Sequence, residues 1–260
     1  MVRFAANLSM LWGERDPYDR LDAAAAAGFR YVEMHFPQHL DVNEVARRLD
    51  RLGLMMVLFD FHAGDVAAGE RGIAALPHRV DEFLEHATRD LEVAERFGTT
   101  YMTVPAGIVS ESWTSKDHDR TLAQNLTTLA GPAADLGITL TVEALNGTDV
   151  PGAHLRTTGD AARIVAAVGL PNVRLQLDQY HSSMEHEDPL AMLARHLDIL
   201  AHVQIADAPG RHEPGTADAP VTEFVARLDE LGYAGFVGLE YHPNGDTDAG
   251  LDWLPRERRA

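Results

Sequence analysis

Four oxygen-bearing side chains occur near the ends of four successive apolar runs in the second half of the chain. Glu143 lies in TLTVEAL, Asp178 in VRLQLDQYH, Gln204 in HVQIAD and Glu240 in FVGLEYHP. A carboxylate inside an apolar run is costly unless it is paired or bound to a cation, and three that converge would repel one another. Hard divalent cations prefer carboxylate and amide oxygens. The pattern therefore predicts a Mg²⁺ or Mn²⁺ site made of these four residues.

A single acidic residue at such a place has a simpler explanation, as a helix N-cap or a salt-bridge partner. Four in register favour the metal site, and a metal flanked by two glutamates suits proton transfer next to a carbonyl group. The cation would hold the carbonyl and hydroxyl oxygens and stabilise an enediolate. One glutamate would remove a proton and the other would deliver one to the adjacent carbon. Aldose–ketose isomerisation and epimerisation both work in this way, and the residues leave both open.

The elements that must position these side chains follow a repeated pattern. A helix-period stretch, a glycine and a short apolar run recur at Gly28, Gly53, Gly98, Gly137, Gly169 and Gly232. Glycine suits the position that ends a helix, and near-continuous apolar runs suit strands buried on both faces of a parallel sheet. With two further runs, the sequence predicts eight strands that begin near residues 3, 30, 54, 100, 138, 173, 201 and 236.

Eight strand–helix units in 260 residues predict a single α/β domain over residues 1–260, a (β/α)₈ TIM barrel. The rival is an open doubly wound sheet, but no Gly-x-Gly-x-x-Gly follows any of the strands. Active sites of such barrels lie at the carboxyl ends of the strands, where the four polar residues would meet. His202 shares a strand face with Gln204, so we expect it to point inward as a satisfied core histidine.

The composition excludes several classes of site. The chain has no cysteine, which excludes disulfides, thiolate zinc sites, iron–sulfur clusters and cysteine nucleophiles. Zinc is less expected at the barrel mouth for the same reason, and because no helical histidine pair has i,i+4 spacing around a glutamate. We expect no organic cofactor.

The net charge of the chain limits the kinds of partner that it can bind. Lys and Arg number 22 and Asp and Glu 40, a net charge of −18, which argues against nucleic acid and an anionic membrane surface. The first residues contain no signal-like apolar segment, and no run is long enough to span a membrane, so we expect a cytoplasmic protein. The oligomeric state stays open, and a homo-oligomer is allowed.

Long blocks of the sequence closely resemble the hydroxypyruvate isomerase family, which belongs with the xylose-isomerase-like TIM barrels. The blocks are FAANLSMLW (4–12), AAAAGFRYVE (24–33), AGDVAAGERGIAALPHR (63–79), VEALN…DVPGAHLRTT (142–158), LDQYH (177–181), HVQIADAPGRHEPGT (202–216) and GYAGFVGLEYHP (232–243). The resemblance implies interconversion of hydroxypyruvate and tartronate semialdehyde (2-hydroxy-3-oxopropanoate), or the similar isomerisation of 2-oxo-tetronates. A ketose 3-epimerase on the same site is a further alternative.

The resemblance also implies roles for individual residues. The metal-ligand pattern of the family falls on the four residues that the strand ends indicate, and its paired catalytic acids fall on Glu143 and Glu240. By similarity to related ketose epimerases, His181 and Arg211 would contact substrate oxygens. A sugar-acid carboxylate approaching a chain of charge −18 needs local cations, and we expect Arg211 and Arg71 to bind it. Arg211 is the stronger candidate, because it follows a ligand-bearing strand by only seven residues.

The chain departs from the family pattern at four places. Asp60 stands where Asn is usual, Ser183 where Gln is usual, and His242 where Lys often occurs, and the loop 215–220 reads Gly-Thr-Ala-Asp-Ala-Pro. We expect all four at loops around the mouth, where the shape of the substrate is recognised. The reaction is therefore better indicated than the substrate.

Three other functions use parts of the same pattern. A sugar-acid dehydratase, which is a lyase, could use the same barrel and metal. A non-catalytic ligand-binding barrel would not need the complete ligand set. An endonuclease-type barrel is disfavoured by the acidic charge and by the scarcity of histidine among the ligands.

Overall fold

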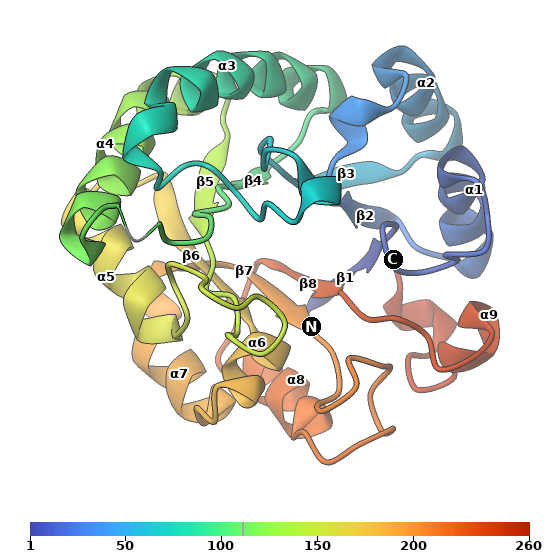
Figure 1. Ribbon diagram of the computed structural model, residues 1–260. Helices are drawn as coiled ribbons and strands as arrows, with labels where there is room; N and C mark the ends of the chain where they lie inside the picture. The colour runs from blue at the N-terminus through green and yellow to red at the C-terminus, as the bar shows by residue number, and fades with distance from the viewer. Residues whose placement is uncertain (111) are drawn as a thin grey trace.

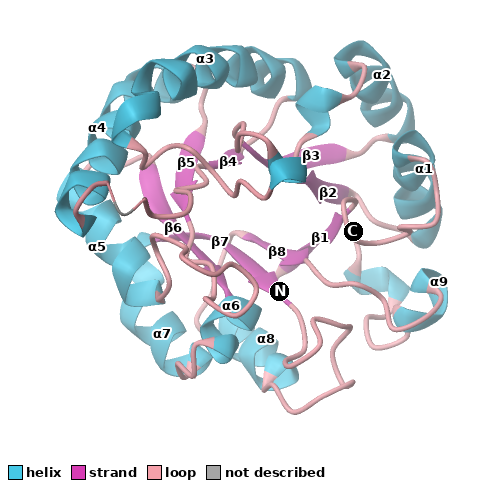
Figure 2. Cartoon of the chain, in the orientation of Figure 1, coloured by secondary structure: helices cyan, strands magenta, loops and turns pink. Residues whose placement is uncertain are grey.

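The computed structural model describes residues 1–110 and 112–260, and its centre is a closed barrel of eight parallel strands (Figures 1 and 2). The strands are β1 (Arg3–Asn7), β2 (Tyr31–Met34), β3 (Met55–Asp60), β4 (Tyr101–Thr103), β5 (Thr139–Val142), β6 (Val173–Asp178), β7 (Leu200–Ile205) and β8 (Phe236–Leu239). They neighbour one another in chain order, and β1 pairs with β8 to close the barrel. The predicted TIM barrel is confirmed, and each predicted strand start lies within one residue of the observed one.

Helices form an outer ring around the barrel (Figure 1). They are α1 (Pro17–Ala27), α2 (Val42–Leu52), α3 (Val80–Phe97), α4 (Ser115–Asp135), α5 (Thr158–Val168), α6 (Gln179–Met184), α7 (Pro189–His196), α8 (Val221–Glu230) and α9 (Thr247–Gly250). Short 3₁₀ helices cover Pro37–His39, Val66–Ala68, Pro77–Arg79, Leu197–Ile199 and Arg256–Arg258. The repeated glycines end helices as predicted, and Gly98, for example, caps α3 with φ 66°. Over the described ranges, no helix is both long and apolar enough to cross a membrane.

The apolar core lies mainly between the barrel and the helices. Phe59 of β3 packs edge-on against Phe97 of α3, with 6.0 Å between the ring centroids. Phe61, just after β3, packs against Phe83 at the other end of the same helix, at 6.3 Å. Because such aromatic pairs are both apolar and geometrically specific, they fix α3 against β3 and the loop that follows it.

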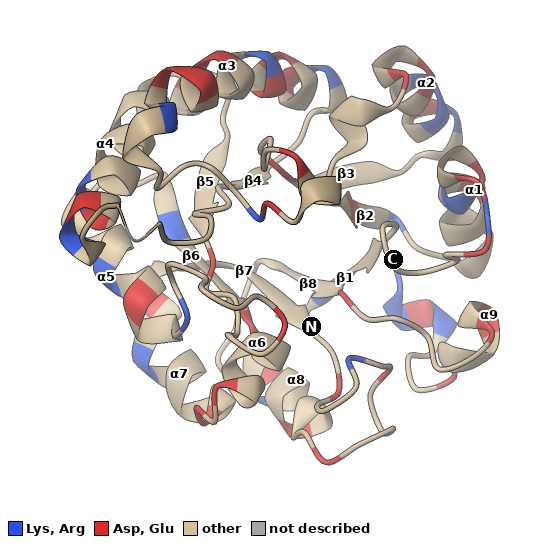
Figure 3. Ribbon diagram, viewed as in Figure 1, with Lys and Arg blue, Asp and Glu red and all other residues tan. Residues whose placement is uncertain are grey.

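Charged residues are few on the strands and frequent on the helices and loops (Figure 3). The strand charges are Arg3, Glu33, Asp60, Arg174 and Asp178. The two arginines lie at the first or second position of their strands, and the three acids lie in the last two positions. The strands therefore bring acidic side chains toward the carboxyl end of the barrel.

A polar layer crosses the barrel interior around Glu33 of β2, whose side chain is fully buried. Glu33 Oε1 accepts hydrogen bonds from Asn7 Nδ2 (2.9 Å) and Gln204 Nε2 (3.0 Å), and Oε2 lies 2.8 Å from His202 Nε2. His202 thus points inward as predicted, although its Nδ1 has no hydrogen-bond partner among the described residues. Gly238 of β8 makes room for the layer, because a Cβ at this position would lie 2.4 Å from each Glu33 carboxylate oxygen.

Candidate active site

A cavity of about 200 Å³ opens at the carboxyl ends of the strands. Five of the residues predicted for the site line it: Arg71, Glu143, His181, Arg211 and Glu240. The other two, Asp178 and Gln204, are 3% and 2% exposed and are held by residues of the same site and of the polar layer. The structure thus gathers these side chains at one end of the barrel.

Glu143 is the first residue after β5, and one of its oxygens is unusual. Its Oε1 is buried and has no hydrogen-bond partner among the described residues. One ligand atom each from Glu143, Asp178 and His181 lie within 4.8 Å of one another. Burial, followed by the charges of Glu240 and Asp178, raises the pKa of Glu143 well above its usual value. A buried acceptor in this position is ready for a cation or a substrate hydroxyl.

Asp178 ends β6 and also begins α6. Its Oδ1 accepts the backbone N–H of Tyr180 at 2.8 Å, which makes it the N-cap of α6. Its Oδ2 lies 3.3 Å from Arg211 Nη2 and 3.5 Å from His181 Nε2. Burial raises the pKa of Asp178 to about 8, with a further rise from Glu240 that Arg211 opposes. One oxygen is therefore structural, and the other faces the site.

The tautomer of His181 follows from its partners. Nδ1 accepts the backbone N–H of Asn146 at 3.2 Å, and the Asn146 side-chain Nδ2 lies 2.6 Å away. Burial, helped by Arg211, lowers the pKa of His181 to about 3, so that the ring is neutral near pH 7. A neutral ring that accepts at Nδ1 carries its proton at Nε2, on the side of Asp178. His181 can therefore donate a hydrogen bond into the site.

Glu240 follows β8 and is held by two cations. Its Oε1 lies 2.7 Å from His35 Nε2, and its Oε2 accepts from Arg211 Nη2 at 2.8 Å. Although burial opposes ionisation, Arg211 and His35 hold the pKa of Glu240 well below its usual range. Burial by itself would lower the pKa of His35, but the hydrogen bond to Glu240 and the charge of Glu240 raise this pKa to about 9.

His35 lines the cavity, although the sequence patterns did not single it out. It is the first residue after β2, at the same kind of position that identified Glu143 and Glu240. The signal is therefore present in the sequence, as a polar residue that follows an apolar run. It follows the second strand, whereas the predicted ligands lie on or directly after strands five to eight.

Arg211 is largely buried and lies between two acidic side chains. Its Nη2 contacts Glu240 and Asp178, and its guanidinium lies 4.9 Å from the ring centroid of Tyr180. Its backbone adopts φ 56°, which few non-glycine residues do. Arg211 therefore sits at the predicted place, where its charge offsets part of the carboxylate repulsion.

Arg71 lies on the loop that follows β3 and enters the cavity lining from there. Its Nη1 donates to the carbonyl oxygens of Val66 (3.1 Å) and Glu70 (2.8 Å), which leaves the rest of the exposed guanidinium for a ligand. The neighbouring Gly72 allows this loop to pass close to Pro105, because a Cβ on residue 72 would lie 2.2 Å from the carbonyl oxygen of Pro105.

Gln204 belongs to the polar layer beneath the cavity. Its Nε2 donates to Glu33, and its Oε1 accepts from Gln176 Nε2 at 2.7 Å. A carbonyl oxygen has a second lone pair, so this atom can still ligate a cation. Because the Glu33 carboxylate only accepts hydrogen bonds from the Gln204 amide, it holds the amide nitrogen toward itself and leaves the amide oxygen toward Gln176.

The donor set fits a hard divalent cation. Asp178 and Glu240 are buried, Glu143 is half-buried with a buried and unpartnered Oε1, and one ligand atom of Glu143 lies within 4.8 Å of one each from Asp178 and His181. Arg211 and His35 offset only part of the negative charge, as the raised pKa values of Glu143 and Asp178 reflect. Oxygen-rich, anionic surroundings of this kind are those that Mg²⁺ and Mn²⁺ occupy.

The four departures from the family pattern have different surroundings. Asp60 is the last residue of β3, rather than a loop residue, and lines the cavity. Burial raises the pKa of Asp60 to about 7, with a further rise from Glu240 that His35 opposes. Ser183 likewise lies in a helix, α6, rather than in a loop, and its hydroxyl accepts a hydrogen bond from Gln179 one turn earlier (2.9 Å).

The remaining two departures, the loop 215–220 and His242, lie in loops that are held in place by hydrogen bonds. Asp207 Oδ2 accepts the backbone N–H groups of Gly215 and Ala217 at 2.8 Å each, which shapes the loop 215–220. The carbonyl oxygen of His242 lies 2.7 Å from His212 Nδ1. Of the four departures, Asp60 is the one that lines the cavity among the described residues.

The chain is similar over nearly its whole length to several known proteins. A 2-oxo-tetronate isomerase from Cupriavidus necator is 41% identical over 254 residues, covering 98% of each chain. A hydroxypyruvate isomerase from Escherichia coli is 37% identical over 254 residues, with the same coverage. A crystal structure of an AP endonuclease, family 2, from Brucella melitensis superposes with a TM-score of 0.94 at 37% identity, covering 98% of each chain.

The family model described as xylose isomerase-like TIM barrel matches residues 21–257, which is nearly the whole chain. The closed eight-stranded barrel is the structural counterpart of that match. This chain therefore belongs to the xylose isomerase-like TIM barrel family.

Proposed function

We propose that the chain is a metal-dependent isomerase of a small sugar acid, which interconverts hydroxypyruvate and tartronate semialdehyde. The observation that carries the proposal is that Glu143 and Glu240, the first residues after β5 and β8, line one cavity, and that Oε1 of Glu143 is buried with no hydrogen-bond partner among the described residues. The names of the relatives, 2-oxo-tetronate isomerase and hydroxypyruvate isomerase, support the same reaction class. A 2-oxo-tetronate is the alternative substrate.

Glu143, Asp178, Gln204 and Glu240 would hold the cation. When bound, Mg²⁺ or Mn²⁺ would act as a Lewis acid that stabilises the negative charge developing on the substrate oxygens. Hydroxypyruvate loses a proton from C3 and gains one at C2, while its hydroxyl proton moves from the C3 oxygen to the C2 oxygen. One glutamate removes the carbon-bound proton and the other supplies its replacement. Substrate and product therefore have the same formula.

The remaining residues bind and orient the substrate. His181 Nε2–H donates to a substrate oxygen, since its Nδ1 is already an acceptor for Asn146. Arg71, an exposed residue of the cavity lining, binds the carboxylate. Arg211 contributes positive charge to the same cavity, where it is held by Glu240 and Asp178.

Replacing Arg71 with alanine tests the carboxylate site. A hydrogen bond to a charged group contributes about 1.5–3 kcal/mol, so we expect KM to rise about 10–100-fold while kcat changes little. Arg71→Lys should recover part of the loss, and Arg89→Ala, at an exposed arginine of α3, is the matched control. Steady-state kinetics on each variant measures the effect, and an unchanged KM in Arg71→Ala would remove this residue from the site.

Removing divalent ions tests the metal requirement. After exhaustive chelation and desalting we expect turnover to vanish, and added Mg²⁺ or Mn²⁺ to restore it, because the repulsion among three carboxylates is otherwise uncompensated. Calorimetric titration of Mn²⁺ into the chelated protein should show one site that Asp178→Asn weakens. Full turnover by metal-free protein, verified by elemental analysis, would contradict this part of the proposal.

The substrate is identified by offering the purified protein hydroxypyruvate, 2-oxo-tetronates and ketoses and following each by NMR and mass spectrometry. An isomerase gives a product of unchanged mass, whereas a dehydratase gives a product lighter by one water. Conversion of the ketoses alone would assign a ketose epimerase instead.

The endonuclease activity named for the Brucella melitensis protein is not favoured here. A nucleic-acid substrate needs a basic face, whereas this chain has a net charge of −18 and mixes acidic and basic residues around its outer ring (Figure 3).

A further inference from the structure

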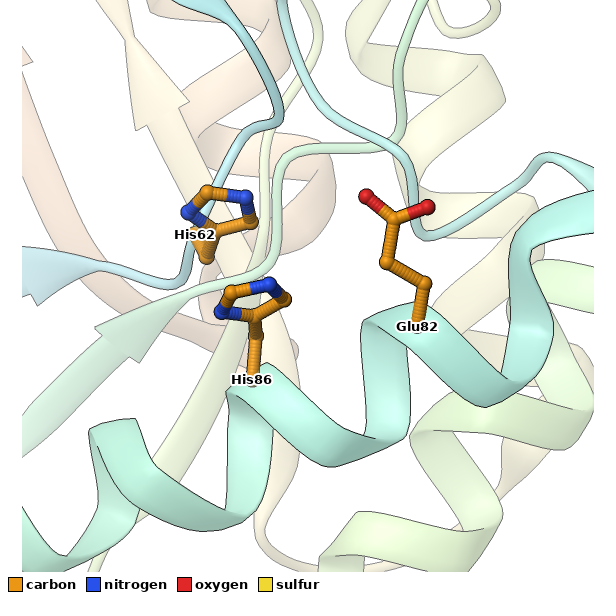
Figure 4. A group of neighbouring side chains, drawn as sticks. All are labelled: His62, Glu82 and His86. Carbon is orange, nitrogen blue, oxygen red and sulfur yellow. The ribbon is translucent and has the colours of Figure 1, made fainter.

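A second group of possible metal ligands lies outside the cavity, between α3 and the loop after β3. The group consists of His62, Glu82 and His86 (Figure 4). His62 is the second residue after β3, while Glu82 and His86 lie one turn apart on α3. One ligand atom from each lies within 4.8 Å of the others. In the part of the chain that the structure describes, none of the three lines the cavity.

We propose that His62, Glu82 and His86 form a binding site for a first-row transition ion of borderline softness, with Zn²⁺ as the type. Two imidazoles and one carboxylate are a donor set that holds zinc in many proteins, with water completing the coordination. Imidazole also suits copper and nickel, whereas Mg²⁺ and Mn²⁺ prefer oxygen. The site is therefore chemically distinct from the three carboxylates and one amide of the cavity, and it does not depend on the proposed function.

The elements that carry the three ligands are held firmly together. The backbone N–H of His62 donates to Asp90 Oδ2 at 2.7 Å, and Asp90 is a buried residue of α3. The Phe61–Phe83 ring contact ties the same loop to the same helix. A site on this framework is preorganised in its backbone, so binding requires only movement of the side chains.

The side chains are close to a coordinating arrangement. The rings of His62 and His86 are stacked, with centroids 3.9 Å apart and an interplanar angle of 16°. Since the nitrogen lone pairs lie in the ring planes, one ring must turn about its Cβ–Cγ bond to aim at a shared ion. Figure 4 shows the Glu82 carboxylate reaching up from α3 toward the level of the two rings.

The charges around the group favour a cation. Burial and the neighbouring His86 and His39 lower the pKa of His62, which favours the neutral ring that binds metal. Arg79 engages both oxygens of Glu82, with Nε donating to Oε2 at 2.8 Å and Nη2 donating to Oε1, and it also pairs with Glu70, so a bound ion would share Glu82 with this arginine. Two carboxylates thus share one arginine, and the group keeps a net negative charge when its imidazoles are neutral.

The test is titration of Zn²⁺ into chelated protein that has been saturated with Mg²⁺, so that the cavity is occupied by a hard ion. Wild type, His62→Gln, His86→Gln and His78→Gln are compared by calorimetry, and His78, an exposed histidine just before α3, is the matched control. We expect wild type and His78→Gln to bind one Zn²⁺ equally. His62→Gln and His86→Gln should bind at least ~10-fold more weakly, since losing even the outer partners of metal ligands costs about 10–100-fold.

Two further measurements guard the interpretation. Circular dichroism should show that all four proteins are folded alike, and Zn²⁺ should raise the melting temperature of wild type and His78→Gln but not of His86→Gln. Absence of a Zn²⁺ site in the Mg²⁺-saturated wild type would overturn the proposal. Equal affinity in His86→Gln and His78→Gln would overturn it as well, by showing that the ion binds elsewhere. Neither result affects the isomerase proposal, which rests on other residues.

Discussion

Replacing Glu143 with glutamine is expected to lower kcat by about 10²–10⁴-fold, the range that a positioned general acid or base contributes. Glutamine has the same size but cannot accept a proton at the reacting carbon. Oε1 of Glu143 has no hydrogen-bond partner among the described residues, so the substitution removes no hydrogen bond to that oxygen. The fold should therefore survive, and relief of the repulsion from Asp178 and Glu240 should leave its melting temperature equal or higher.

Glu240→Gln should lower kcat in the same range but also disturb the structure, because His35 and Arg211 lose their shared partner. The matched control is Glu92→Gln, at an exposed glutamate of α3. Steady-state kinetics on the identified substrate, with circular dichroism to verify folding, distinguishes the outcomes. Near-normal turnover in either Glu143→Gln or Glu240→Gln would show that the two glutamates do not share the proton transfer.

Gly238→Ala is expected to destabilise the barrel from within. The added Cβ would lie 2.4 Å from both carboxylate oxygens of Glu33, which are committed to Asn7, His202 and Gln204. Overpacking combined with a disturbed buried pair should lower the free energy of unfolding by about 3 kcal/mol. That change corresponds to a decrease of about 6–12 °C in melting temperature for a chain of this size.

Gly159→Ala is the matched control for this change. Gly159 is an exposed residue in the first turn of α5 and has no positive φ, and a Cβ there would lie at an ordinary 3.7 Å from Thr157 Oγ1, so alanine should leave stability equal or slightly higher. Thermal unfolding followed by circular dichroism measures both variants. If the melting temperature of Gly238→Ala equals that of wild type, the polar layer around Glu33 does not require a glycine at this position.

Much of the barrel could be predicted because its signals are local. A glycine that ends a helix and the apolar run that follows it are adjacent in the sequence, and together they placed six of the eight strand starts within one residue. The polar residues at the ends of the last four strands were recognisable for the same reason. Glu143, His181 and Glu240 accordingly line the cavity.

The rest depends on contacts between distant parts of the chain. Glu33 lies beside His202 because β2 and β7 face one another across the closed barrel, a distance of 169 residues in sequence. Likewise, His35 meets Glu240 across 205 residues. The engagement of Arg211 by Glu240 and Asp178 depends on its positive φ, which nothing local in the sequence indicates. The same holds for the approach of His62 to α3.

Conversion of hydroxypyruvate in D₂O by Mg²⁺-loaded protein, followed by NMR, tests the central claim most directly. Transfer through two glutamates exposes the proton to solvent, so we predict a product of unchanged formula that carries solvent deuterium at C2, and no such product from Glu143→Gln. A product that carries the substrate's own hydrogen at C2 would mean direct transfer between the carbons, and would contradict proton transfer through the two glutamates.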